Sequence, residues 1–189
     1  MKTELHREHF TTSRECEYFT KKELRAQIGH DTPYWPLAIL RELIDNSLDA
    51  CEMAGVAPEI HVEIKNDIVT VSDNGNGIHS EIIEKSMDYL VRVSDKVHYV
   101  SPTRGAMGNA LKVVWAAPFV TSGSSVIEVI TRGEKHTIKV SLDLIAGKPS
   151  IEHSREPFVK KGTFIKIEWP ESSQLTSERF KRFLQTSLS

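Results

Sequence analysis

The longest helical pattern in the chain runs from Trp35 to about Met53, and it constrains the fold more than any other feature. Its apolar side chains recur at helical spacing and form one stripe, made of Leu37, Leu40, Leu43, Ile44, Ser47, Leu48 and Cys51. Gly55 lies where a helix stop is expected. A long helix with a single apolar face has to bury that face against a second layer of secondary structure.

The other segments of the chain supply that second layer. Further helices are expected over residues 21–28, 80–90, 106–116 and 176–184, and Pro118 is expected to end the third of them. Strands are expected over residues 60–64, 68–71, 126–131, 137–144 and 163–169, with a hairpin turn at Lys65-Asn66-Asp67. A helix-rich first half followed by a strand-rich second half predicts an α+β fold. We expect a two-layer sandwich whose mixed, mostly antiparallel sheet carries its helices on one face.

The length of 189 residues is that of one ordinary domain with short additions. We expect an N-terminal extension over residues 1–33, a central domain over 34–170 and a C-terminal helix over 171–189. Hydrophobic residues make up 39% of the chain and charged residues 26%, so it can build a buried core and is not a disordered polymer.

Charge and cysteine content exclude several classes of protein. The chain has 24 Lys and Arg against 26 Asp and Glu, a net charge of −2. This charge excludes a protein that binds nucleic acid through a broadly basic surface. Two cysteines exclude a disulfide scaffold. No apolar run approaches the roughly 18 residues of a membrane span, and the charged N-terminus lacks the apolar centre of a secretory signal. A cytoplasmic protein without a membrane partner is therefore expected.

The polar face of the long helix is the first candidate site. At about 100° per residue, Glu42, Asn46 and Asp49 fall within one narrow wedge opposite the apolar stripe. A carboxylate and an amide oxygen one turn apart suit a hard cation and a polarised water. The same pattern is also typical of a solvated helix face, and the helix alone does not decide between the two.

A glycine-rich turn follows the second strand and is the second candidate. Residues Asp73 to Ile78 read Asp-Asn-Gly-Asn-Gly-Ile, and glycine permits positive φ and close approach of a ligand to the backbone. An aspartate at a strand end can accept a hydrogen bond from an exocyclic amine. A plain Asx turn is the alternative interpretation.

The third candidate is the helix start from Arg104 to Lys112, which contains Gly105 and Gly108. Glycines there expose backbone amides at the end of a helix that attracts anions. A simple helix start with close packing is the alternative. The chain has no Walker-type phosphate loop, and Gly75 and Gly77 lack the third glycine of a dinucleotide-binding fingerprint.

Taken in order, these segments resemble the motifs of the GHKL ATPases, the superfamily of gyrase-type topoisomerase subunits, heat-shock chaperones of the ninety-kilodalton class, histidine kinases and mismatch-repair MutL. The segment from Glu42 to Ala50, ELIDNSLDA, resembles the N box. Residues 73–78 resemble the DxGxG box and residues 105–110 the GxxGxA box, while Gly162-Thr163 is similar to a late GT motif. Within the superfamily, ELIDNSLDA and RGAMGNA are most similar to the motifs of the topoisomerase VI B-type proteins.

The resemblance implies the Bergerat fold, with ATP bound under a lid formed here by the long loop over residues 91–105. Glu42 would be the general base that orients water toward the γ-phosphate, and Asn46 would hold Mg²⁺. Asp73 would accept from the adenine amine, with a water shared by Thr163. The whole implied ATP-binding set comprises Asn46, Asp49, Asp73, Gly75, Gly77, Ile78, Arg104, Gly105, Ala106, Met107, Gly108, Asn109, Ala110 and Thr163.

The activity implied is Mg²⁺-dependent ATP binding with slow hydrolysis that gates dimerisation or the action of a partner. Histidine kinases lack a glutamate at the position of Glu42, so its presence favours water over a protein side chain as the phosphoryl acceptor. Phosphotransfer of the histidine-kinase kind remains one alternative. A nucleotide-gated interaction module without hydrolysis is another.

Partners follow from the same resemblance. Hydrolysing relatives bring a lysine to the γ-phosphate from a following domain, and the sequence after Trp169 shows no counterpart of it. We expect a second domain or subunit to supply that lysine. We also expect a monomer that forms a homodimer on ATP binding, with the segment up to Pro33 as a strap and DNA involved only indirectly.

Overall fold

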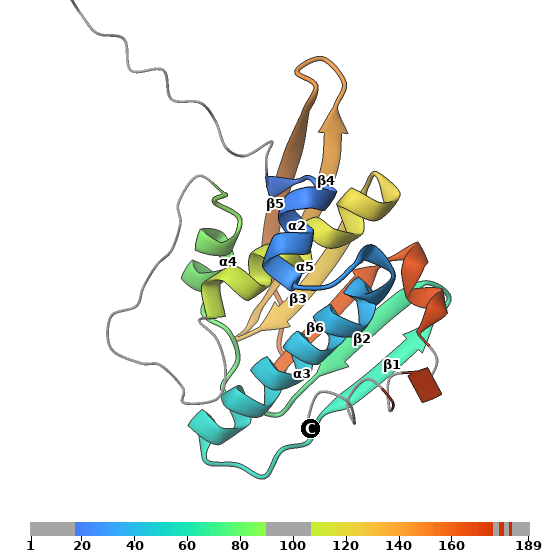
Figure 1. Cartoon of the computed structure of the whole chain (residues 1–189). Helices are drawn as coiled ribbons and strands as arrows, with labels where there is room; N and C mark the ends of the chain where they lie inside the picture. Colours follow the sequence, from blue (N-terminus) through green and yellow to red (C-terminus); the bar gives the residue numbers. More distant parts are fainter. Residues whose placement is uncertain (1–17, 90–106, 176–177, 180–181, 183–189) are drawn as a thin grey trace, which may run out of the picture.

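The computed structural model describes residues 18–89, 107–175, 178–179 and 182 (Figure 1). Within these residues the chain forms four α-helices, two 3-10 turns and six strands. In chain order they are α2 (Lys21–Ile28), η1 (Thr32–Tyr34), α3 (Trp35–Ala54), β1 (His61–Lys65), β2 (Ile68–Ser72), α4 (Ser80–Ser86), α5 (Met107–Ser122), β3 (Ser125–Thr131), β4 (Glu134–Asp143), β5 (Lys148–Pro157), β6 (Thr163–Glu168) and η2 (Pro170–Gln174).

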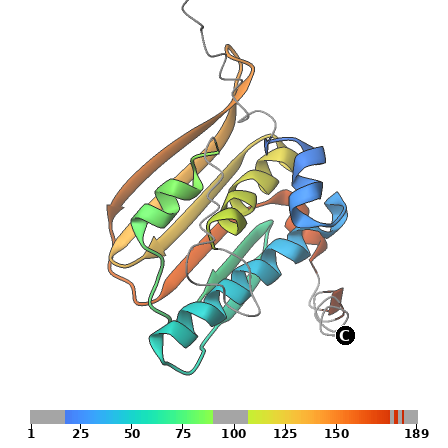
Figure 2. The same ribbon diagram turned by 60° about the vertical axis from the view of Figure 1, so that its left-hand side comes forward.

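The six strands form one sheet in the order β1-β2-β6-β3-β4-β5, and every described pairing is antiparallel. Strand β6 lies between β2 and β3, so a late segment of the chain closes the sheet at its centre. The helices lie on one face of the sheet, as Figure 2 shows. The predicted two-layer α+β sandwich is confirmed.

Helix α3 follows the predicted pattern closely. It begins at Trp35, has Pro36 in its first turn and ends at Ala54, and Gly55 caps it with a left-handed φ of 64°. That conformation suits glycine, because a Cβ there would be strained. Five of the seven predicted stripe residues are buried, with Leu40 and Cys51 almost completely inaccessible, while Ile44 and Leu48 are half-buried. Ile39, which was not in the predicted stripe, is buried as well.

Three buried tryptophans each donate a hydrogen bond within the core. The indole N–H of Trp35 donates to the His30 carbonyl at 2.9 Å. That of Trp115 donates to Ser86 Oγ at 2.8 Å, and that of Trp169 to Thr121 Oγ1 at 2.8 Å. A buried indole needs such a partner. Each side chain therefore adds apolar area to the core without leaving an unpaired donor.

Pro118 does not end helix α5, contrary to the prediction. The helix continues to Ser122, and Gly123 follows it with a left-handed φ of 83°. A proline inside a helix costs about 3 kcal/mol. Trp115 is fully buried and Phe119 nearly so, and burial of each large apolar side chain contributes roughly 1.5–3 kcal/mol. The packing of these two side chains in the core thus outweighs the lost hydrogen bond.

Strand β5 was absent from the sequence prediction. Its sequence, KPSIEHSREP, has two prolines and one large apolar residue, Ile151, so it carries no alternation of apolar and polar residues. It pairs with β4 along its full length and lies at the edge of the sheet, where proline is tolerated. Strand β4 accordingly begins at Glu134, earlier than predicted.

Other boundaries differ or lie outside the described residues. Helix α4 ends at Ser86 rather than at residue 90, and the Ser86 hydroxyl donates to the Ile83 carbonyl at 2.6 Å. The predicted lid over 91–105 lies outside the described residues, as do residues 1–17 of the extension and most of the C-terminal helix. Helix α2 of the extension was predicted with its observed bounds. Among the described residues, no helix combines the length and apolarity needed to cross a membrane.

Candidate functional site

A cavity of about 200 Å³ lies between α3, the turn after β2 and the strand ends at the centre of the sheet. Apolar side chains form most of its wall, and a few polar groups converge on it, as is usual for small-molecule sites. The lining residues are Leu43, Asn46, Ser47, Ala50, Met53, Asp73, Asn76, Gly77, Ile78, His79, Ile82, Leu111, Arg132, Thr163 and Ile165.

Asp73 is the carboxylate of this cavity, and its side chain is held by the backbone. It follows β2 directly, and only 9% of the residue is exposed. Its Oδ1 accepts from the Gly75 amide at 2.9 Å and from the Thr163 amide at 3.1 Å. No hydrogen bond found among the described residues uses Oδ2. That oxygen is therefore the acceptor available to a donor in the cavity.

The turn after Asp73 is packed between α3 and β3. A Cβ on Gly75 would lie 2.7 Å from the carbonyl carbon of Ala50, and one on Gly77 would lie 2.5 Å from Thr131 Oγ1. Thr131 Oγ1 accepts from the Ile78 amide at 2.7 Å and lies 3.3 Å from the Ile78 carbonyl oxygen. Both glycines are thus required by close packing, and Gly77 also by its φ of 77°.

The polar face of α3 lies at one side of the cavity. Asn46 lines it and offers an amide oxygen, a ligand that suits Mg²⁺ together with phosphate oxygens. Glu42 is half-buried one turn earlier, outside the lining residues. Burial raises the pKa of its carboxyl, and the neighbouring carboxylates Asp45 and Asp49 raise it further against the opposing effect of Arg41. A raised pKa makes Glu42 a stronger base.

Residues 33–173 match the model of the histidine kinase-, DNA gyrase B- and HSP90-like ATPase family. The chain belongs to this family. It is a GHKL ATPase domain, and its similarity to curated members is spread along most of its length.

The relatives that the chain resembles include the B subunit of the type 2 DNA topoisomerase 6 of Natronomonas pharaonis, 31% identical over 164 residues. The corresponding protein of Archaeoglobus fulgidus is 32% identical over 163 residues. Each match covers 81% of this chain but only 20% and 27%, respectively, of the relative. A crystal structure of the N-terminal domain of a DNA repair protein is similar with a TM-score of 0.41 and 24% identity, over 79% of this chain and 39% of that one.

The fold brings five of the implied GHKL residues to one cavity: Asn46, Asp73, Gly77, Ile78 and Thr163. Glu42, Asp49 and Gly75 lie beside it without lining it. Residues 107–110 form the first turn of α5, directly before the lining residue Leu111. Arg104, Gly105 and Ala106 lie outside the described residues, and so do the side chains of Met107 and Asn109.

Sequence reasoning missed the β3 side of the GHKL cavity. Thr131 fastens the turn through Ile78, and Arg132 lines the cavity and donates from Nη1 to the Asn76 carbonyl at 3.0 Å. A threonine at a strand end carries no distinctive pattern. Arg132-Gly133, a two-residue turn with positive φ at both positions, was the available signal for a loop that returns to the site.

Proposed function

We propose that the chain binds ATP with Mg²⁺ in this cavity and hydrolyses it slowly. The observation that carries the proposal is the hydrogen bonding of Asp73. Two backbone amides occupy its Oδ1, and Oδ2 remains as a fixed acceptor inside a mostly apolar cavity. A carboxylate fixed in this way accepts from the exocyclic amine of adenine and rejects a base with a carbonyl at that position.

The reaction needs positioned groups more than covalent chemistry. Asn46 would hold the Mg²⁺ that accompanies the phosphates, and the ion would offset charge on the transferring group. Glu42, one helical turn away, would take a proton from the attacking water, and its raised pKa suits that role. Backbone amides at the start of α5 would face the phosphates.

Hydrolysis is favoured over phosphotransfer, and an assay separates it from a third function. Phosphotransfer to a protein side chain, as in histidine kinases, would not need a base at Glu42, and burial beside two carboxylates raises the pKa of this residue toward that of a useful base. A nucleotide-gated module without turnover would use the same binding residues. A turnover assay with and without Mg²⁺ separates that module from an ATPase.

The partners proposed here follow from the relatives. The topoisomerase 6 relatives are by name subunits of a DNA topoisomerase, and this chain spans only about a quarter of the one from Archaeoglobus fulgidus. We propose that ATP binding promotes association with a second copy or another subunit, which supplies a lysine to the γ-phosphate. Residues 1–33 would act as the strap, and DNA would be engaged only indirectly.

Replacing Asp73 by asparagine is expected to weaken ATP and ADP binding by about one to two decades. Asparagine Oδ1 can still accept from the Gly75 and Thr163 amides, so the fold should be retained. Its amide nitrogen, however, would present a donor to the adenine amine, and a mispaired buried polar group costs about 1–3 kcal/mol. Calorimetric titration of both nucleotides checks the result.

Inosine triphosphate provides the matched control, because its base has a carbonyl oxygen in place of the adenine amine. The Asp73→Asn variant should prefer it over ATP, whereas the parent chain should prefer ATP. Equal affinity of parent and variant for ATP would show that Asp73 does not contact the base.

A further inference from the structure

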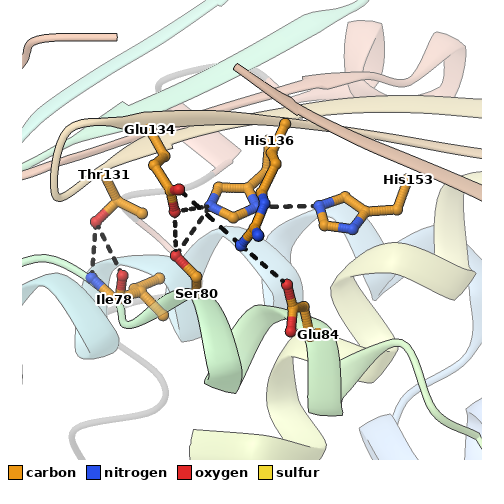
Figure 3. Close-up of polar contacts among 8 residues, drawn as sticks. Ile78, Ser80, Glu84, Thr131, Glu134, His136 and His153 are labelled. Atoms are coloured by element: carbon orange, nitrogen blue, oxygen red, sulfur yellow. Dashed lines mark hydrogen bonds and ion pairs between the residues drawn. The ribbon is translucent and has the colours of Figure 1, made fainter. Parts of the chain in front are cut away.

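A cluster of polar side chains lies in the seam between α4 and strands β4 and β5 (Figure 3). Ser80, the first residue of α4, donates to Glu134 Oε2, and its Oγ lies 3.5 Å from His136 Nε2. His136 is completely buried, with Glu134 Oε2 at 3.6 Å from the same nitrogen. The GHKL site uses none of these side chains.

His136 and His153 face each other across β4 and β5, which are paired strands. Their nitrogens Nδ1 and Nε2 lie 3.0 Å apart, and the two rings are parallel within 1°. A neutral imidazole has one N–H and one bare nitrogen. The pair therefore shares one proton between the facing nitrogens, and a first extra proton can sit on an outer nitrogen. When both rings are fully protonated, two N–H groups oppose each other and the bond is lost.

The same cluster lies next to the turn over residues 73–78 that borders the cavity, called the nucleotide turn below. Ser80 follows Ile78 by two residues, and Ile78 is held by Thr131 at the cavity. The α4 N-terminus is thus fastened at two adjacent points, to the end of β3 through Thr131 and to β4 through Glu134. A movement of the His136 ring therefore acts directly on Ser80, which it contacts. It acts on the turn through the backbone between Ser80 and Ile78.

Charged groups face the pair from each neighbouring element. Glu84 of α4 and Arg155 of β5 lie 3.4 Å apart, and Arg155 is 4.0 Å from Glu134. Glu81 and Lys85 of α4 are exposed. The one charged residue of α5, Lys112, instead donates to the Asp88 carbonyl. Among the described residues, no group of three or more His, Cys, Asp or Glu is placed to hold a metal ion.

We propose that the His136–His153 pair is a proton-sensitive positioning element for the nucleotide turn. With the hydrogen bond intact it holds the start of α4, and with it Ile78, against the sheet. Full protonation of both rings breaks the bond, loosens the turn and weakens nucleotide binding. This inference rests on the proposed function, because it assigns a regulation to the same site.

The direction of the pH dependence follows from burial. Burial lowers the pKa of both histidines, and for His136 the neighbouring His153 lowers it further, against Glu134 and Glu84. The unfolded or loosened state, with an ordinary pKa of about 6.5, therefore binds more protons on acidification. The state in which the turn is held against the sheet is fully favoured at pH values above about 6.5. This preference is lost as the pH falls below that value.

His153→Gln is the test variant, since glutamine can still bond to His136 and cannot be protonated. Between about pH 7.5 and 5.5, the affinity of the parent chain for ADP should fall about tenfold more than that of the variant. The phosphate groups of ADP also titrate in this range, but they affect the parent chain and the variant equally, so a comparison at the same pH removes their contribution. His61→Gln, on the exposed strand β1, is the matched control and should behave as the parent chain.

A second measurement uses the ligand-free parent chain and needs neither a nucleotide nor a variant. Nuclear magnetic resonance follows the hydrogen exchange of the Ile78 amide and, through the ring resonances, the protonation of both histidines. The proposal expects Ile78 exchange, corrected for its intrinsic rate, to accelerate as both rings protonate. Constant Ile78 protection through that titration, or equal pH dependence in parent and His153→Gln, would overturn it. Absence of ADP binding at either pH would instead overturn the proposed function, and the Ile78 measurement would still decide the inference.

Discussion

Replacing Glu42 by glutamine is expected to reduce ATP hydrolysis by roughly 10²–10⁴-fold while ATP affinity changes little. Glutamine keeps the size of the side chain on the polar face of α3 but cannot take a proton from water. Glu42 lies outside the residues that line the cavity, so nucleotide contacts should persist. Single-turnover hydrolysis and calorimetric titration on the same preparation separate the two effects.

Glu52→Gln is the matched control for this experiment, because Glu52 is an exposed glutamate at the other end of α3. The hydrolysis rate of the parent chain should also fall on the acid side at a pH above the usual range of a carboxyl group, since the pKa of Glu42 is raised. Hydrolysis by Glu42→Gln at the rate of the parent chain would show that another group is the base.

Gly162→Ala is expected to lower the free energy of unfolding by about 3–5 kcal/mol and to abolish ATP binding. Gly162 has a φ of 75°, and a Cβ there would lie 1.9 Å from the Asp73 carbonyl oxygen. The obstacle is backbone, so β2 and β6 would have to separate. That movement would break the paired hydrogen bonds between Asp73 and Thr163, which fix the carboxylate.

Gly147→Ala separates the two sources of this cost. Gly147 has a φ of 63° and nothing within 4 Å of the added carbon, so only backbone strain of about 1 kcal/mol is expected. Urea unfolding of the parent chain and both variants measures the difference. Equal destabilisation by the two substitutions would mean that the contact between Gly162 and Asp73 is not a structural requirement.

Local sequence patterns correctly predicted the helices and turns whose conformation depends mainly on their own residues. The apolar stripe and Gly55 gave α3 within one residue at its end, and the Asn66-Asp67 turn appears with positive φ at both residues. The three motifs lay far apart in the chain, and only the resemblance to the GHKL ATPases predicted that they meet. The fold brings Asn46 and Asp73 to one cavity because β2 lies beneath α3.

Features that depend on contacts with other elements were not predictable from the same patterns. Pro118 is tolerated because Trp115 and Phe119 are buried in the core, where Trp115 donates to Ser86 of α4 and the Phe119 ring contacts Phe19. Strand β5 forms because β4 offers it an edge. Thr131 acquires its role only when the β2 turn packs against the end of β3. The contacts around Pro118 and at Thr131 join segments that lie far apart in the sequence, whereas β5 pairs with the strand directly before it.

Calorimetric unfolding of the parent chain with Mg²⁺ and either ATP or GTP tests the assignment of an adenine site most directly. At about 100 times its Kd, ATP should stabilise the chain by about 2.7 kcal/mol, which raises Tm by roughly 5–11 °C for a domain of this size. GTP at the same concentration should raise Tm much less, because its base has a carbonyl where adenine has its amine and Asp73 Oδ2 would face another acceptor. An unchanged Tm with ATP, or equal shifts with both nucleotides, would contradict the proposal that this cavity is an ATP site read by Asp73.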